Sequence, residues 1–276
     1  MTIESSKVEI QGTSLHRLVL KPKAPEKGGL VFFHGQGDFI DRYPLILERF
    51  VNAGYRCLLT DLLGHGRSPG IRGHVPGLGF IDELFAESLE HLSGPLVLAG
   101  HSMGGLMALR LFLLHPERFQ AAWFSSPLLG ILDRTHPILA GILPFLAKFL
   151  PRLTIGTGVT GDQCGDFGGR LRNENPETEA LYHGRISLGW GLQLHQACEM
   201  VWKEISHAPS RTPLLFTQGE EDVICPPHLL RKLLDRSPCE DAHLDLIPEA
   251  RHESFSGTSR EDFLKRLDLW IGKTLL

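Results

Sequence analysis

The sequence predicts an α/β protein with a mostly parallel sheet that carries helices on both faces. Three observations support this prediction. Short apolar runs of strand length recur along the chain, helix-like segments separate them, and the runs lack an alternation of apolar and polar residues. Continuous apolar runs are typical of parallel strands, because helices cover both sides of such a sheet.

The composition is that of an ordinary globular chain. The 276 residues are 42 % hydrophobic and 22 % charged, enough to bury a full core without a metal ion or a disulfide. The 28 basic and 32 acidic residues give a net charge of −4, and the basic residues form no block, so no nucleic acid partner is expected. Five cysteines without close pairs, an opening segment unlike a signal peptide and no apolar run of ~18 residues predict a cytoplasmic protein with reduced thiols.

The strands can be assigned in chain order. Weak alternation over the first twenty residues predicts an antiparallel hairpin that turns at Gln11-Gly12. Buried strands are then expected at residues 29–33, 55–60, 95–99, 121–124, 213–217 and 242–247. The expected sheet therefore has eight strands, and right-handed βαβ connections make most of them parallel.

A final helix is predicted to begin near Ser259. The segment from Ser259 to Asp262 resembles a capping box, in which a serine side chain and an acidic side chain satisfy free backbone N–H groups. Four apolar residues at helical spacing would form its buried stripe: Phe263, Leu267, Trp270 and Ile271.

The alternation of strands and helices stops after residue 126. A break of roughly 80 residues in a regular α/β chain predicts an inserted subdomain, so we expect residues 1–126 and 211–276 to form the core and 127–210 a helical cap. Apolar residues at helical spacing predict a helix in the cap: Ile138, Ile142, Phe145 and Phe149, widened by Leu139, Leu143, Leu146 and Leu150. The cap either only packs on the core or lines the substrate entrance.

Ser102 is the predicted nucleophile. The strand 95–99 runs into Gly100-His-Ser-Met-Gly104 and then into an apolar helix, which is the setting that a G-x-S-x-G turn requires. Side chains in place of Gly100 and Gly104 would collide with neighbouring backbone in so tight a turn. The turn therefore presents Ser102 above the strand ends, with the positive end of a helix beneath it.

Two backbone N–H groups are predicted to form an oxyanion hole. The tetrahedral intermediate of acyl transfer carries a negative oxygen, which fixed donors must meet. One donor is the N–H of Met103, directly after the nucleophile. The other is the N–H of Gln36, because His34-Gly-Gln-Gly37 follows a buried strand and its glycines let the loop turn back toward Ser102. His34 is expected to brace this loop by hydrogen bonds.

His252 and Asp222 are the predicted base and acid. A serine nucleophile needs a base, and the base needs an orienting carboxylate; in proteins with this turn the chain order is serine, acid, histidine. His252 follows the last predicted strand, whereas the other late histidines lie inside that strand, on a helix or in the cap. Asp222 follows the strand 213–217, with Glu220 and Glu221 as its competitors.

These motifs together resemble the monoacylglycerol lipase and lysophospholipase group of α/β-hydrolases, which includes serine aminopeptidase-like proteins. The matching segments lie on both flanks of the cap: His34–Gly37, Asp41–Tyr43, Gly54-Tyr55, Asp61–Ser68, Gly100–Gly105, Ser126-Pro127, Gly219–Asp222 and Arg251–Glu253. The resemblance implies the α/β-hydrolase fold, a triad of Ser102, Asp222 and His252, and Gln36 and Met103 as oxyanion donors.

Two departures from the resembled group and two further segments bear on the expected site. Asp38-Phe39 stands where the group commonly has Glu-His, and His183-Gly-Arg185 replaces its usual Asp-Pro pair, both near the expected substrate site. Cys225 matches a cysteine of some monoacylglycerol lipases, although we interpret it as a small buried hydrophobic side chain. The glycines of Asp61–Ser68 predict a tight loop that holds neighbouring loops in place.

The sequence therefore predicts a serine esterase that works through an acyl-enzyme and needs no metal or organic cofactor. The apolar stripe of the cap favours a small-molecule ester with an apolar acyl group, such as a monoacylglycerol or lysophospholipid. It also suggests a weak peripheral contact with a membrane. Hydrolysis of a thioester, a prolyl amide or a carbon–carbon bond on the same triad stays open, as does a non-catalytic binding protein, which would not need all three triad members.

Overall fold

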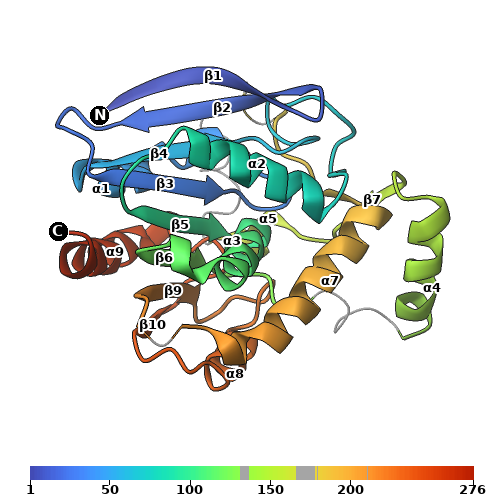
Figure 1. Cartoon of the computed structure of the whole chain (residues 1–276). Coiled ribbons are helices and arrows are strands. Elements are labelled where there is room, and N and C mark those ends of the chain that lie inside the picture. Colours follow the sequence, from blue (N-terminus) through green and yellow to red (C-terminus); the bar gives the residue numbers. More distant parts are fainter. Residues whose placement is uncertain (131–136, 166–177, 179, 210) are drawn as a thin grey trace.

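The fold is a single eight-stranded sheet with helices on both faces (Figure 1). The computed structural model describes residues 1–130, 137–165, 178, 180–209 and 211–276. The sheet has the order β1-β2-β4-β3-β5-β6-β9-β10. Its strands are β1 (Thr2–Ile10), β2 (Thr13–Lys21), β3 (Gly28–Phe33), β4 (Tyr55–Thr60), β5 (Leu96–His101), β6 (Ala121–Ser125), β9 (Leu214–Gly219) and β10 (Ala242–Ile247).

The predicted eight-stranded, mostly parallel sheet is confirmed. β1 and β2 form the expected antiparallel hairpin, which turns at Gln11 and Gly12 with φ angles of +50° and +72°. β2 is antiparallel to β4, and every pair from β4 across to β10 is parallel. All residues of β3, β6 and β9 are buried, which explains why their sequences are continuous apolar runs.

Two hydrophobic clusters cover the two faces of the sheet. The helices α1 (Pro44–Asn52) and α9 (Arg260–Thr274) bury their apolar faces in one cluster. The helices α2 (Leu78–Glu90), α3 (Met103–Leu114) and α8 (Pro227–Leu234) contribute to the other. The parallel strands are thus enclosed on both sides, and their carboxyl ends are left as the accessible edge where loops can form a site.

The last helix is confirmed, but its predicted capping box is wrong. Phe263, Leu267, Trp270 and Ile271 are all buried, as their spacing indicated. Ser259 stands at the N-cap with helical backbone angles and makes no side-chain cap. Its hydroxyl instead donates to the carbonyl oxygens of Ser254 and Ser256, each at 3.0 Å. A residue that caps with its side chain typically has extended backbone angles, and Ser259, at the end of a 3-10 turn, does not have them.

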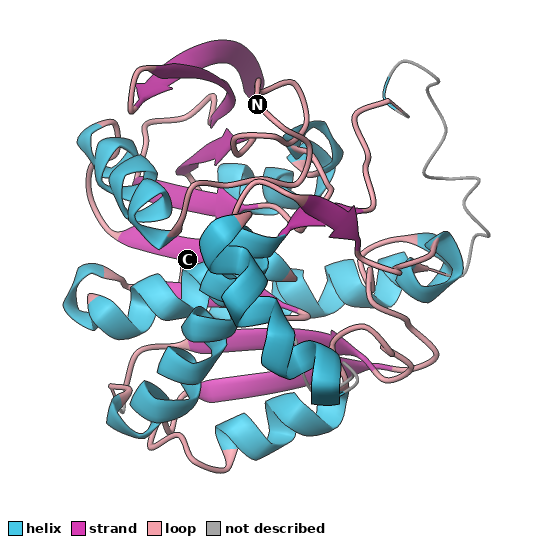
Figure 2. Cartoon of the chain, turned by 90° about the vertical axis from the view of Figure 1, so that its right-hand side faces the viewer, coloured by secondary structure: helices cyan, strands magenta, loops and turns pink. Residues whose placement is uncertain are grey.

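The described residues of the predicted cap, 127–210, include helices that lie toward the carboxyl ends of the strands. This region contains α4 (Pro137–Phe149), β7 (Thr154–Gly156), α5 (Gly161–Cys164), β8 (Arg185–Ser187) and α7 (Leu188–Glu204). In Figure 1 the arrowhead of β3 points toward the side where α7 and α4 lie, and Figure 2, seen from that side, shows helices in front of the sheet. The short antiparallel pair of β7 and β8 was not predicted, since three-residue strands leave no pattern.

The predicted cap helix exists as α4, but its apolar stripe is not uniformly buried. Ile142 is 46 % exposed, Phe145 64 % and Phe149 63 %. The side chains of residues 138, 139 and 143, which belong to the predicted stripe, lie outside the described residues. Helical spacing thus predicted the helix correctly and did not predict whether protein covers it.

Within the described ranges, no helix combines the length and apolar character needed to cross a membrane.

Candidate active site

Ser102 occupies a strained turn between β5 and α3. Its φ of +56° and ψ of −119° lie in a region that residues with a side chain rarely adopt. A Cβ on Gly100 would lie 2.3 Å from the carbonyl oxygen of Gly104, and one on Gly104 would lie 2.0 Å from that of Phe33. The glycines of the G-x-S-x-G motif are therefore required by backbone contacts, and the turn holds Ser102 at the carboxyl edge of the sheet.

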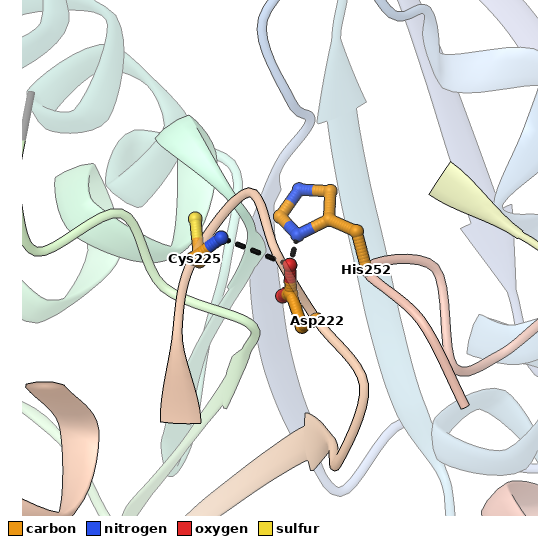
Figure 3. Close-up of side chains that lie close together, drawn as sticks. All are labelled: Asp222, Cys225 and His252. Atoms are coloured by element: carbon orange, nitrogen blue, oxygen red, sulfur yellow. Dashed lines mark hydrogen bonds and ion pairs between the residues drawn. The ribbon is translucent and has the colours of Figure 1, made fainter. Parts of the chain in front are cut away.

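Asp222 and His252 form a buried pair on the loops that follow β9 and β10. The Nδ1–H of His252 donates to Oδ2 of Asp222 at 2.7 Å (Figure 3). The Asp222 carboxylate also accepts hydrogen bonds from the backbone N–H groups of Ile224 and Cys225 and from Nε2 of Gln218. Its alternatives Glu220 and Glu221 are exposed. The structure thus gives Asp222 the contact with His252 that sequence order predicted.

The two partners of this pair shift each other's pKa. Burial alone would raise the pKa of Asp222, but the adjacent His252 and the hydrogen bonds to the carboxylate outweigh it and lower the pKa. Burial likewise opposes protonation of His252, yet the charge of Asp222 holds the imidazole pKa well above 6.5. The neutral imidazole, which predominates above this pKa, is the form that can accept a proton.

Cys225 lies close to the predicted base, since its Sγ is within 4.8 Å of a ring nitrogen of His252. The neighbouring His252 and Ser102 side chains both act to lower the pKa of its thiol. Among the hydrogen bonds of the described residues, none joins the Ser102 hydroxyl directly to His252; hydrogen bonds between a nucleophile and its base are often long without substrate. Cys225 is buried as predicted, and burial raises its thiol pKa. Its contact with both side chains was not predicted, because loop residues leave no local signal for it.

The loop after β3 supplies the second predicted oxyanion donor. A Cβ on Gly35 would lie 3.5 Å from that of Ser102, so this loop packs directly against the nucleophile turn. Within the described part of the chain, no hydrogen bond uses the backbone N–H of Gln36 or that of Met103. His34 braces the loop as expected: its Nδ1 bonds to the carbonyl oxygen of Gly35 at 2.8 Å, and its Nε2 accepts from the N–H of Leu62 at 3.0 Å.

Residues of the predicted cap hold the same loop from above. The N–H of His183 donates to the carbonyl oxygen of Gly37 at 3.0 Å, and Nε2 of Gln36 donates to that of Arg185 at 2.7 Å. Gly37 has a φ of +74°, and a Cβ there would lie 1.9 Å from the carbonyl oxygen of His183. The His183–Arg185 segment, which departs from the resembled family, therefore contacts the oxyanion loop itself.

The loop that carries His252 is held by α5. The backbone N–H of Glu253 donates to the carbonyl oxygen of Cys164 at 2.7 Å. The guanidinium of Arg251 donates to the carbonyl oxygens of Asp162, at 2.7 Å, and Gly165, at 3.1 Å. Free carbonyl groups at the end of a helix are natural acceptors for such donors. Both the predicted base and the oxyanion loop thus depend on contacts with residues 127–210.

The Asp61–Ser68 loop has the bracing contacts that its glycines suggested. Asp61 accepts from the backbone N–H groups of Ile40 and Arg67, each at 2.8 Å. The Ser68 hydroxyl donates to the carbonyl oxygen of Asp61 at 2.6 Å.

One group of possible metal ligands is found among the described residues. Asp222, Cys225 and His252 each place a ligand atom within 4.8 Å of the others. The carboxylate already accepts the four hydrogen bonds given above, and one of them comes from His252 itself. This donor set fits a hydrogen-bonded acid–base pair better than a metal centre.

Known proteins with similar sequences and folds include lipases and a phospholipase. A monoacylglycerol lipase from Mycolicibacterium smegmatis is 27 % identical, with 97 % of this chain and 96 % of the relative covered. The phospholipase YtpA of Bacillus subtilis is 26 % identical, with 86 % and 92 % covered. The crystal structure of the Paleococcus ferrophilus monoacylglycerol lipase has a TM-score of 0.84 and 27 % identity, covering 94 % of this chain and 99 % of that one. The family model described as serine aminopeptidase, S33, matches residues 24–258, and the chain therefore belongs to this family of α/β-hydrolases.

Proposed function

We propose that this protein hydrolyses carboxylic esters with apolar acyl groups through an acyl-enzyme on Ser102. The observation that carries the proposal is the buried Asp222–His252 hydrogen bond of 2.7 Å beside a strained serine turn. Lipases and a phospholipase among the relatives support ester hydrolysis as the reaction class.

In the proposed reaction, Nε2 of His252 takes the hydroxyl proton of Ser102 as the oxygen attacks the ester carbonyl. Asp222 keeps the proton on Nδ1 and stabilises the imidazolium. The backbone N–H groups of Gln36 and Met103 bind the oxyanion. Collapse of the intermediate breaks the ester bond, and His252 returns the proton to the leaving alcohol. Water, activated by the same histidine, then releases the carboxylic acid.

The apolar surface of residues 127–210 supports an apolar substrate and a weak contact with lipid. Large apolar side chains that are more than 40 % exposed gather on and after α4: Ile142, Phe145, Phe149, Leu150, Leu153, Ile155 and Val159. We call these seven residues the cap patch. Exposed apolar side chains that gather in this way are typical of surfaces that bind lipid or a partner. The patch belongs to the same predicted cap as His183 and Arg185, which contact the loop of Gln36. It would let the enzyme draw monoacylglycerols or lysophospholipids from a lipid surface.

The test is hydrolysis of p-nitrophenyl esters from two to sixteen carbons by the purified protein and by Ser102→Ala. Turnover that is greatest for medium or long chains and is lost in Ser102→Ala supports the proposal, and monoacylglycerols are then the substrates to test. Turnover of the acetate alone contradicts an apolar acyl pocket.

A fluorophosphonate label separates the remaining outcomes. If Ser102 is labelled but no ester is turned over, Ser102 remains the nucleophile and the substrate contains another carbonyl bond, such as a thioester or a prolyl amide. If the protein shows no turnover and Ser102 is not labelled, the protein is a non-catalytic one on this fold.

A further inference from the structure

Trp190 is a fully buried residue in the first turn of α7. Its exposure is 0 %, and its backbone N–H donates to the capping hydroxyl of Ser187 at 3.2 Å. The start of the helix is tied to the core, since the N–H of Ser187 donates to the carbonyl oxygen of Gly73 at 2.9 Å. These two backbone hydrogen bonds fix the position of the helix turn that carries the Trp190 indole.

The indole N–H meets the side chains of two residues that are distant in sequence. Nε1 of Trp190 lies 3.1 Å from Oε1 of Gln36 and 3.3 Å from Sδ of Met103. These are the same two residues whose backbone N–H groups are the predicted oxyanion donors. One donor from α7 thus contacts the side chains of both, and Met103 is itself fully buried.

The contact matters most for Gln36, whose own backbone N–H makes no hydrogen bond among the described residues. It lies between two glycines, and its side-chain amide makes one hydrogen bond at each end: Oε1 accepts from the Trp190 indole N–H, and Nε2 donates to the carbonyl oxygen of Arg185. Glycines permit many backbone conformations, so an unbraced loop would sample orientations in which the Gln36 N–H no longer faces the oxyanion. Catalysis by such donors depends on their being oriented before the reaction.

We propose that Trp190 is a positioning residue for the oxyanion hole, because its indole N–H sets the side chains, and through them the backbone N–H groups, of Gln36 and Met103. The inference rests on the proposed ester hydrolysis. It implies that the packing of α7 against the core also orients the oxyanion donors. The site can therefore catalyse the reaction only when this helix is in place.

Trp190→Phe tests the proposal, since it keeps an aromatic ring and removes the N–H. Loss of a whole oxyanion donor typically lowers kcat by about 10²–10³-fold, so loss of its brace is expected to lower kcat about 10-fold with KM nearly unchanged. Trp202→Phe on the same helix is the matched control. It removes an indole N–H that donates at 2.8 Å to the carbonyl oxygen of Leu129, and it is expected to keep the wild-type kcat.

Inhibition by an alkyl trifluoromethyl ketone gives a second readout. Ser102 adds to its carbonyl, the proton passes to His252, and the resulting anionic oxygen needs the same donors. Its affinity should fall in Trp190→Phe in parallel with kcat/KM, which mere loss of packing would not produce.

Gln36→Leu gives an independent variant if Trp190→Phe folds poorly, as thermal unfolding will show. It removes the acceptor, and the double variant Gln36→Leu/Trp190→Phe is expected to lose no more activity than the worse single variant. An unchanged kcat in folded Trp190→Phe, an equal loss in Trp202→Phe, or additive losses in the double variant would overturn the inference while leaving ester hydrolysis intact. A wild-type protein no more active than Ser102→Ala would instead overturn the proposed function, and the inference with it.

Discussion

Asp222 accepts the Nδ1 proton of His252 over 2.7 Å, and both side chains are at least 96 % buried, with exposures of 3 % and 4 %. This contact fixes the histidine tautomer and leaves Nε2 as the nitrogen that can take a proton. An asparagine at this position keeps the shape and one oxygen to accept from the backbone N–H groups of Ile224 and Cys225, so Asp222→Asn removes the charge with little change in shape.

Asp222→Asn is expected to lower kcat by about 10⁴-fold, since an amide cannot stabilise the imidazolium and favours the wrong tautomer. Ester hydrolysis at saturating substrate measures the loss. Glu221→Gln, at an exposed position of the same loop, is the matched control and should leave kcat unchanged. Equal activity of the two variants would remove Asp222 from the mechanism.

The pH dependence of kcat/KM should report the pKa of His252. The base must be neutral to accept a proton, and Asp222 holds its pKa well above 6.5, so activity should rise with pH through a limb centred above that value. In Asp222→Asn the main cause of the raised pKa is gone, so the limb should move to lower pH while the maximum falls. A wild-type limb at or below pH 6.5 would contradict the assignment.

Ser102 is expected to reduce the stability of the fold. Its left-handed φ of +56° costs on the order of 1–3 kcal/mol for a residue with a Cβ, and glycine avoids that cost. Ser102→Gly should therefore be more stable than Ser102→Ala by about 1 kcal/mol, although both lack activity. Urea unfolding measures the difference. The same two substitutions at Ser5, an exposed position of β1, should rank in the opposite order of stability, with Ser5→Ala more stable than Ser5→Gly, because glycine weakens a strand.

Gly37→Ala should impair both folding and turnover. Gly37 and Gly12 have nearly equal φ angles of +74° and +72°, but a Cβ on Gly12 meets nothing within 4 Å, whereas one on Gly37 meets the His183 carbonyl at 1.9 Å. Gly12→Ala thus shows the cost of the backbone strain alone, about 1 kcal/mol, with full activity. Gly37→Ala should lose more stability and also lower kcat, because it displaces the loop of Gln36. Matching losses in both variants would mean that the His183 contact is unimportant.

The cap patch should make binding to vesicles depend on Phe145 and Phe149. These side chains are 64 % and 63 % exposed, so replacing both with Ser removes apolar surface without opening a core. Flotation with phosphatidylcholine vesicles is expected to fall several-fold, while hydrolysis of a short water-soluble ester stays at the wild-type rate. Leu269→Ser, at a 67 % exposed position on α9, serves as the control and should float as the wild type does.

The sequence alone determined the features that depend on neighbours in the chain. Apolar runs located the buried strands, because a strand covered on both faces needs apolar side chains at every position. The glycines around Ser102 indicated the nucleophile turn, because a Cβ at those positions would lie only 2.0 to 2.3 Å from a backbone oxygen. The order of Ser102, Asp222 and His252 selected one histidine and one carboxylate, which the structure places within hydrogen-bond distance.

Only the tertiary structure decided the contacts between distant segments. The hydrogen bond between Gln36 and Arg185 joins residues that are 149 positions apart in the sequence. Nothing in the local sequence of either residue predicts this bond. The same holds for Cys225 beside Ser102, for Trp190 over both predicted oxyanion donors, and for Ser259, which bonds to nearby carbonyls instead of capping its helix. The physical reason is that periodicity and turn chemistry act over a few residues, whereas the exposure of α4 and the bracing of the oxyanion loop depend on which surfaces meet once the chain has folded.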